Sequence, residues 1–280
     1  MLGHKLVQTL SLDFDVWATV RGESKTFDRF KIFDKAQIYE SIDAENIEEI
    51  ETIIDTIKPQ VVINAVGIIK QLPESKDIVQ TLTINSIFPH RLAEITKKYN
   101  ARLITFGTDC VFSGKKGNYK EEDLADAADL YGKSKNLGEV VSDNCLTLRT
   151  SIIGRELFSA HSLVEWFLSN RGKRVRGYTN AVFSGFPTII ISEIIADLIV
   201  NHKNLEGLYH LSSEPINKFD LLNLLKKQYK IDIEIEPYEN FYIDRSLDST
   251  KFRAATGFQP IGWGKMLQTM ADDKKLYRQL

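Results

Sequence analysis

Residues 60–66, QVVINAV, form a run of mostly β-branched and apolar residues. Such runs are typical of strands that are buried on both faces of a parallel sheet. On both sides of this run, strand-like and helix-like patterns alternate along the chain. We expect strands at 15–20, 60–66, 102–106 and 145–150, and helices at 44–57, 79–99 and 130–142. This alternation predicts an α/β fold with a doubly wound parallel sheet.

In the second half of the chain, the regular alternation of strand-like and helix-like patterns ends. Asn217, followed by Asp220 three residues later, resembles a capping box at the start of a helix. Residues 231–237 alternate between apolar and polar side chains, as a half-buried strand does. A short helix is expected between a cap at Asp248 and a closing glycine, Gly257. These patterns predict a smaller α/β lobe that is interleaved with the last part of the sheet.

The composition limits the kinds of partner. The 280 residues are 43% hydrophobic and 26% charged, and the net charge is −2. A charge this small gives no reason to expect a nucleic-acid partner, and the apolar stretches are too short and too interrupted to cross a bilayer. No signal peptide pattern opens the chain, and two cysteines, Cys110 and Cys145, are too few for a disulfide framework. We therefore expect a cytoplasmic protein with no membrane partner.

Tyr131 and Lys135 form a Tyr-x-x-x-Lys motif within a predicted helix. Residues four apart lie on one face of a helix, and a lysine cation there stabilises the phenolate and lowers the tyrosine pKa. The tyrosine could then give or take a proton near neutral pH. Taken alone, the motif is weak, because in most soluble helices it is an exposed Tyr–Lys pair.

Other polar residues are predicted at the same edge of the sheet. Thr108 follows the predicted strand at 102–106, and Asn64, Ala65 and Val66 end the strand before it. The carboxyl ends of parallel strands form the ligand crevice of open α/β sheets. The Thr108 hydroxyl could therefore hydrogen-bond a substrate carbonyl beside Tyr131.

Together with Asn85, residues Thr108, Tyr131 and Lys135 resemble the active-site set of extended short-chain dehydrogenases/reductases. Within that superfamily, TDCVFSG (108–114), YGKSKNLGE (131–139) and LRTSIIG (148–154) are similar to the dTDP-4-dehydrorhamnose reductase family. The resemblance extends over essentially the whole chain. It implies a Rossmann-type NAD(P)-binding domain at 1–154 and a substrate-binding lobe at 155–280.

The resemblance also implies an activity. NADPH, with NADH as the alternative, would reduce the ketone of a nucleotide-linked 4-keto-6-deoxy sugar, in the biosynthesis of deoxysugars for cell-surface polysaccharides. Tyr131 would give its proton to the alkoxide, Thr108 would bind the same oxygen, and Lys135 would hold the nicotinamide ribose. Asn64, Ala65, Val66 and Asn85 would belong to the cofactor site. The nucleotide-diphosphate sugar would be the main partner, and a homodimer is possible.

Arg21 bears on the choice between the two cofactors. An NAD site has a carboxylate at the end of the second strand, whereas the 2′-phosphate of NADP favours a cation. Arg21 follows the strand at 15–20 and is expected to fill that place, although a solvated surface arginine is the alternative. Asp43 and Ala44 resemble the pair that meets the adenine. Asp43 could also be the N-cap of the next helix.

Three further residues are assigned to the substrate by the same resemblance. Arg245 resembles the residue that grips the nucleotide phosphates, and a guanidinium fork suits diphosphate oxygens. Asp109 and Val111 would shape the wall of the substrate pocket, with packing of the loop as an equal alternative. Cys110 is interpreted as a small buried residue. No metal site is expected, because neither the histidines nor the carboxylates show ligand spacing.

The opening MLGHKL, 1–6, resembles the end of a phosphate-binding turn. Gly3 matches the last glycine of a G-x-x-G-x-x-G turn, with Leu2 beside it, while the first strand and the first two glycines are absent from the sequence. In one interpretation Met1 is an internal methionine of a chain longer by roughly ten residues. In the other, the short chain has an impaired pyrophosphate site. We favour the first, because the other site residues are intact.

Two alternative functions are kept open. One is another reductase or epimerase for nucleotide-diphosphate sugars, since contacts at GIIKQ, 67–71, would decide which sugar fits. The other is a non-catalytic nucleotide-binding regulatory subunit that keeps the fold. The presence of Thr108, Tyr131 and Lys135 argues against this last interpretation.

Overall fold

A four-stranded parallel sheet forms the centre of the computed structural model, which describes residues 1–273 and 277. Leu103 and Ile104, neighbours on β4, are both completely buried and face opposite sides of the sheet. The strands, in spatial order, are β10 (Gly207–His210), β5 (Cys145–Thr150), β4 (Arg102–Thr108) and β3 (Val61–Asn64). The predicted α/β class with a parallel sheet is confirmed.

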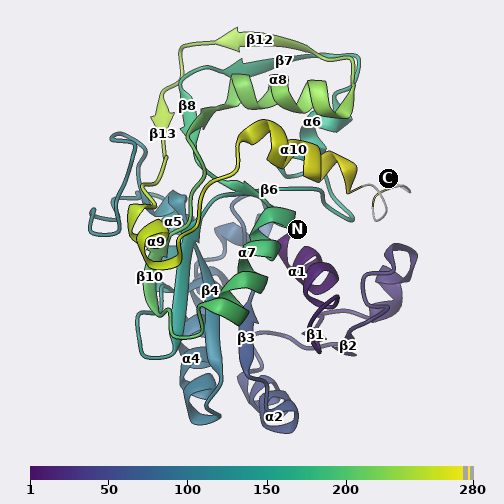
Figure 1. Ribbon diagram of the computed structural model, residues 1–280, viewed down its shortest axis with the longest axis vertical. Coiled ribbons are helices and arrows are strands. Elements are labelled where there is room, and N and C mark those ends of the chain that lie inside the picture. Colours follow the sequence, from purple (N-terminus) through teal and green to yellow (C-terminus); the bar gives the residue numbers. More distant parts are fainter. Residues whose placement is uncertain (274–276, 278–280) are drawn as a thin grey trace.

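The sheet is interrupted beyond β3. β1 (Trp17–Thr19) and β2 (Gln37–Tyr39) form a separate parallel pair, which lies on the far side of β3 from β4 in Figure 1. Within residues 1–273 and 277, no strand hydrogen-bonds to β3 on that side. β3 is therefore an edge strand whose first three residues are only half buried. The prediction that 60–66 is buried on both faces is wrong, and β4 and β5 take that place.

Helices cover both faces of the sheet, as a doubly wound fold requires. On one face, α2 (Ile47–Ile57) and α4 (Phe88–Lys98) pack on Leu103. On the other face, α1 (Leu2–Leu10) packs beside α7 (Thr188–Asn201), as Figure 1 shows. The short 3₁₀ segment η1 (Ser24–Phe30) connects β1 to β2.

The helix predicted at 79–99 is present, but it is not a regular α-helix throughout. Pro89 has no N–H to donate to the carbonyl of Asn85 four residues earlier, so regular α-helical bonding cannot continue there. The backbone widens to a π-helical turn at this place, a feature often found at functional sites. In chain order the segment consists of η2 (Pro73–Lys76), α3 (Ile78–Leu82), the π-turn η3 (Thr83–Ile87) and α4.

The second lobe lies above the sheet in Figure 1. Asn217 caps α8, with its Oδ1 accepting the N–H of Asp220, as predicted. The N-cap of α9 is Ser249 and not Asp248, whose carboxylate instead accepts the N–H of Thr250. The strands are β6 (Ile152–Ile153), β7 (Arg174–Tyr178), β8 (Ala181–Phe183), β9 (Phe186–Pro187), β11 (Ile216–Asn217), β12 (Glu234–Tyr238) and β13 (Ile243–Asp244). The helices are α6 (Leu163–Ser169), α8 (Lys218–Tyr229), α9 (Thr250–Thr256) and α10 (Trp263–Asp272).

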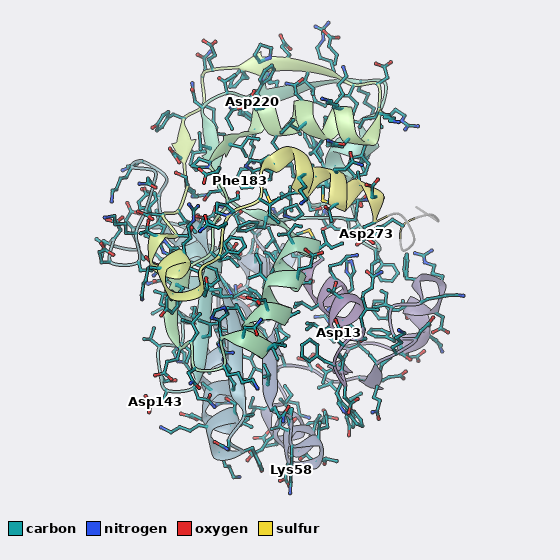
Figure 2. The ribbon with its side chains drawn as sticks, in the orientation of Figure 1. Asp13, Lys58, Asp143, Phe183, Asp220 and Asp273 are labelled. Atoms are coloured by element: carbon teal, nitrogen blue, oxygen red, sulfur yellow. The ribbon has the colours of Figure 1, made fainter. Side chains whose placement is uncertain are left out.

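One apolar core joins the sheet to the lobe. It includes Leu2 of α1, Ile104 of β4 and Leu221 of α8. Phe183, labelled in Figure 2 where α10 passes below α8, contacts Trp263 with ring centroids 5.5 Å apart. The division of the chain at residue 154 stays a prediction. Across the described part of the chain, no helix has the length and apolar character needed to cross a membrane.

Candidate active site

Thr108 lies at the carboxyl end of β4, where the chain turns into η4 (Asp109–Val111). Its Oγ1 accepts the N–H of Cys110 at 3.1 Å and donates to the carboxylate of Asp109 at 3.3 Å. The second distance is long for a hydroxyl donor. A hydroxyl has one proton and two lone pairs, so Thr108 can hold the turn by accepting and still donate its proton to a ligand.

The helix α5 (Leu130–Leu137) places Tyr131 and Lys135 beside this turn. Asp129 caps the helix by accepting the N–H of Gly132 at 2.9 Å. A Cβ at Gly132 would lie 2.4 Å from the carbonyl oxygen of Cys110, so only glycine lets the helix pack this closely on the turn. The Nζ of Lys135 donates to the carbonyl of Phe106 on β4 at 2.8 Å. The structure thus brings Thr108, Tyr131 and Lys135 together.

The pKa values of Tyr131 and Lys135 are shifted mainly by burial. Burial raises the pKa of the Tyr131 phenol, Cys110 and Asp109 raise it further, and the Thr108 hydroxyl that faces it lowers it. The main influences on this pKa are burial and the groups around the turn, and the expected lowering by Lys135 stays a prediction. Burial lowers the pKa of Lys135 to about 8, and the carboxylate of Glu139 opposes that shift. The phenol is therefore a proton donor at neutral pH.

Asn85 connects the neighbouring loop to α5 from within the π-turn. Its Oδ1 accepts the N–H of Ile68 at 2.9 Å, and its Nδ2 donates to the carbonyl of Ile68 and to Oγ of Ser134. Asn85 is 1% exposed, so its side chain is fully engaged within the protein. Its direct contacts are with the loop 67–71 and with Ser134 of α5, and its part in the cofactor site stays a prediction.

The first of the residues expected to bind the cofactor lie where β3 ends and α1 begins. Ala65 and Val66 are exposed, while Asn64 is buried and accepts the N–H of Val66 at 3.0 Å. The N-terminus of α1 faces this bend, since a Cβ at Gly3 would lie 3.7 Å from the Cβ of Ala65. Leu2 turns its side chain into the core and can offer only backbone groups. Helix N–H groups above exposed small residues fit a pyrophosphate.

Arg21, Asp43 and Ala44 lie past the carboxyl ends of β1 and β2. The N–H of Ile42 donates to the carbonyl of Val20 at 3.0 Å, which holds the two connections side by side. Arg21 and Asp43 are both exposed. Asp43 does not cap the following helix, because Asn46 is the N-cap of α2, and Asp43 accepts the N–H of Glu45 instead. Their contacts with an adenosine phosphate stay a prediction.

Arg245 follows β13 and reaches the turn after Thr108. Its Nε donates to the carbonyl of Phe112 at 2.9 Å, and one terminal nitrogen lies 3.6 Å from the Sγ of Cys110. Asp109 is 5% exposed and faces this guanidinium; burial raises its carboxyl pKa, and Arg245 opposes the rise. Val111 is completely buried in a small apolar cluster, which favours loop packing over contact with a substrate.

Two features were missed from the sequence. The first is a buried ion pair in which both oxygens of Glu139 accept from Arg149, at 2.6 and 2.7 Å. Glu139 lies just beyond the end of α5, and its pairing with Arg149 on β5 has no local signal in the sequence. The second is Lys218, whose ammonium faces Asp109 and Arg245. Nothing in its local sequence marks it out.

A parallel sheet with a threonine at a strand end and a Tyr-x-x-x-Lys helix beside it defines an extended short-chain dehydrogenase/reductase. The comparisons with known proteins agree. The family model described as the RmlD substrate binding domain matches residues 1–276. The chain therefore belongs to the RmlD substrate binding domain family. Among the described residues, no group of three or more His, Cys, Asp or Glu side chains could hold a metal ion.

Relatives and solved structures of this kind match most of the chain. The dTDP-4-dehydrorhamnose reductase of Aggregatibacter actinomycetemcomitans is 26% identical over 258 residues, which are 83% of this chain and 87% of the relative. A hypothetical dTDP-4-dehydrorhamnose reductase from Sulfolobus tokodaii is 24% identical, with a TM-score of 0.76 and coverage of 94% of both chains. The Bacillus anthracis reductase in complex with NADP is 20% identical, with a TM-score of 0.75 and coverage of 91% of this chain and 98% of that one.

Proposed function

We propose that this protein reduces the 4-keto group of a nucleotide-linked 6-deoxy sugar with NADPH, as a dTDP-4-dehydrorhamnose reductase does. The observation that carries this proposal is the convergence of Thr108, Tyr131 and Lys135 at the end of β4. A partly buried phenol that keeps its proton is suited to protonate an alkoxide as it forms. The named relatives support the nucleotide sugar as the substrate class.

When bound, NADPH supplies the hydride for the keto carbon. Tyr131 gives its proton to the oxygen on that carbon, and Thr108 donates a hydrogen bond to the same oxygen. Lys135 is fixed against the carbonyl of Phe106 and offers its remaining N–H donors to the nicotinamide ribose. Its charge also stabilises the phenolate that Tyr131 leaves behind.

The rest of the cofactor would lie along the carboxyl ends of β3 and β1. The N-terminus of α1 at Gly3 would hold the pyrophosphate above Ala65 and Val66. Arg21 would contact the 2′-phosphate, and Asp43 and Ala44 the adenine. NADH fits the same site without the contact to Arg21, so we propose NADPH as the preferred cofactor and NADH as a weaker one.

We also propose a cytoplasmic homodimer. In the superfamily that this chain resembles, the helix that carries Tyr and Lys often packs across a dimer. Apolar side chains near that helix support this arrangement, with Leu137 60% and Val141 66% exposed, and Ile87 on η3 48% exposed. The free thiols of Cys110 and Cys145 are compatible with a reducing compartment. Light scattering coupled to size-exclusion chromatography measures the oligomeric state directly.

The decisive assay follows NADPH oxidation with a panel of keto-sugar nucleotides that includes dTDP-4-dehydrorhamnose. The proposal predicts turnover with dTDP-4-dehydrorhamnose, and slower turnover when NADH replaces NADPH. Turnover only with a sugar that carries its ketone elsewhere would instead identify a related reductase or epimerase. Tight NADPH binding with no turnover of any keto sugar would overturn the enzyme proposal and favour a nucleotide-binding regulatory subunit.

A further inference from the structure

Lys218 and Arg245 each follow a strand of the same small sheet in the second lobe. In the sheet β11–β8–β13, both Asn217 and Asp244 pair with Val182. Lys218 follows Asn217 as the first residue of α8, and Arg245 follows Asp244. The sheet register thus places the two basic residues on opposite sides of β8, next to the turn that follows Thr108.

The ammonium of Lys218 lies within electrostatic reach of this turn and of Arg245. The groups that act on its charge are the carboxylate of Asp109, the thiol of Cys110 and the guanidinium of Arg245. Lys218 is partly buried, and burial lowers its pKa, as does Arg245. Within residues 1–273 and 277, its ammonium takes part in no hydrogen bond or ion pair. Its three N–H donors are therefore free to bind water or a ligand.

The charge of this cluster is unbalanced. Two cations, Lys218 and Arg245, face one buried carboxylate, Asp109, whose own pKa is raised by burial. Arg245 uses its Nε and one terminal nitrogen on Phe112 and Cys110, and its other terminal nitrogen has no partner among the described residues. An anion with several oxygens would satisfy the free donors of both side chains and neutralise the excess charge.

Helix stability does not explain Lys218. The N-terminus of a helix carries a partial positive charge, so a lysine at the first position is unfavourable by a few tenths of a kcal/mol to about 1 kcal/mol. Asp220, labelled on α8 in Figure 2, has the favourable charge for the first turn, while Lys226 and Lys227 lie in the favourable last turn. Lys218 therefore costs stability where it stands, which is typical of residues kept for binding.

We propose that Lys218 is a second substrate-binding cation, which acts with Arg245 to bind the diphosphate of the nucleotide sugar. The inference rests on the proposed function for the identity of the substrate. Arg245 presents a planar fork that is fixed by the Phe112 carbonyl, whereas Lys218 supplies a movable point charge. Asp109 balances part of the positive charge and fixes the turn between them.

The test measures binding of dTDP, UDP and GDP to the NADPH-loaded full chain, by calorimetry, for wild type and three variants. Lys218→Met removes the charge and keeps the length of the stem, and Lys218→Arg restores a cation. Lys227→Met is the control, since Lys227 is exposed on the same helix. The inference predicts that Lys218→Met weakens the best-bound diphosphate on the order of 10- to 100-fold, as expected for a hydrogen bond to a charged group.

Three further readouts separate binding from folding. The midpoint of urea unfolding should not fall in Lys218→Met, the NADPH affinity should not change, and the salt dependence of diphosphate affinity should become weaker. Lys218→Arg should recover most of the affinity, and Lys227→Met should match wild type. Equal diphosphate affinity in Lys218→Met and wild type would overturn the inference, as would a wild-type chain that binds none of the three diphosphates. A chain that shows the predicted loss but reduces no keto sugar refutes the proposed function alone.

Discussion

The pair Glu139–Arg149 should control the pH range in which Lys135 is charged. Both side chains are buried, 7% and 5% exposed, and they lie against Gly107, the residue before Thr108 on β4. Lys135 has a pKa of about 8, which burial lowers and Glu139 raises. Glu139→Gln removes the carboxylate charge and leaves the positive charge of Arg149 in place. The loss of the carboxylate and the uncompensated charge of Arg149 should both lower the pKa of Lys135.

The size of the shift follows from the separation of the two charges. Glu139 lies just beyond the end of α5, and for unit charges about 6 Å apart the interaction is about 3 kcal/mol at an effective dielectric constant near 20. That energy corresponds to about two pKa units. Arg149 already screens part of the carboxylate, so we expect about one unit. At pH 8, the charged fraction of Lys135 would fall from about a half to about a tenth, and kcat/KM about fivefold.

The assay is the pH profile of kcat/KM for NADPH oxidation with the keto-sugar nucleotide, which reports the groups of the free enzyme. The alkaline limb should move to lower pH in Glu139→Gln and to higher pH in Arg149→Met, and it should return close to wild type in the double variant. Each single variant leaves a buried charge unpaired and costs about 3–5 kcal/mol of stability, so urea unfolding is measured alongside. A lower rate with an unmoved alkaline limb in both single variants would refute this account and leave the pair a purely structural role.

Three more predictions concern other residues. Tyr131→Phe keeps the packing but removes the proton donor, so kcat should fall on the order of a hundredfold or more while the NADPH dissociation constant changes little, and near-normal turnover would reject Tyr131 as the acid. Arg21→Glu should weaken NADPH more than NADH in equilibrium binding, and an equal effect on both would mean that Arg21 does not contact the 2′-phosphate. Burial and Arg149 lower the pKa of His210 to about 4. Between about pH 6.5 and pH 4 the unfolded chain therefore binds a proton at this residue that the native chain does not. The free energy of unfolding should fall by about 3 kcal/mol when the pH is lowered from about 6.5 to about 4. His210→Gln should flatten this dependence in urea unfolding, and an unchanged slope would contradict the assignment.

Local signals in the sequence located the main parts of the site. The Tyr-x-x-x-Lys spacing, the strand before Thr108 and the cap at Asn217 are local patterns, and the structure has them where they were expected. Gly257 closes α9 in the left-handed conformation with φ of 71°, as a terminal glycine does. These features depend on neighbours a few residues away, so one sequence suffices to find them.

The remaining features depend on contacts between distant segments. The partial exposure of β3 follows from the missing partner on one side, and no property of QVVINAV reveals that. The raised pKa of Tyr131 comes mainly from burial and from Cys110 and Asp109, which lie far from it in the sequence. Lys218 joins Arg245 only through the pairing of β11 and β13 with β8. Spacing along the chain carries none of this information.

The central claim is that hydride passes to the keto carbon of a nucleotide sugar while Tyr131 supplies the proton. The most direct measurement uses NADPH that carries deuterium at the transferred position, with dTDP-4-dehydrorhamnose as substrate and mass spectrometry of the product. The account predicts one deuterium on the former ketone carbon for the wild-type chain, and product formation slowed on the order of a hundredfold in Tyr131→Phe. Product without deuterium, or no product from the wild-type chain under saturating NADPH, would contradict the account.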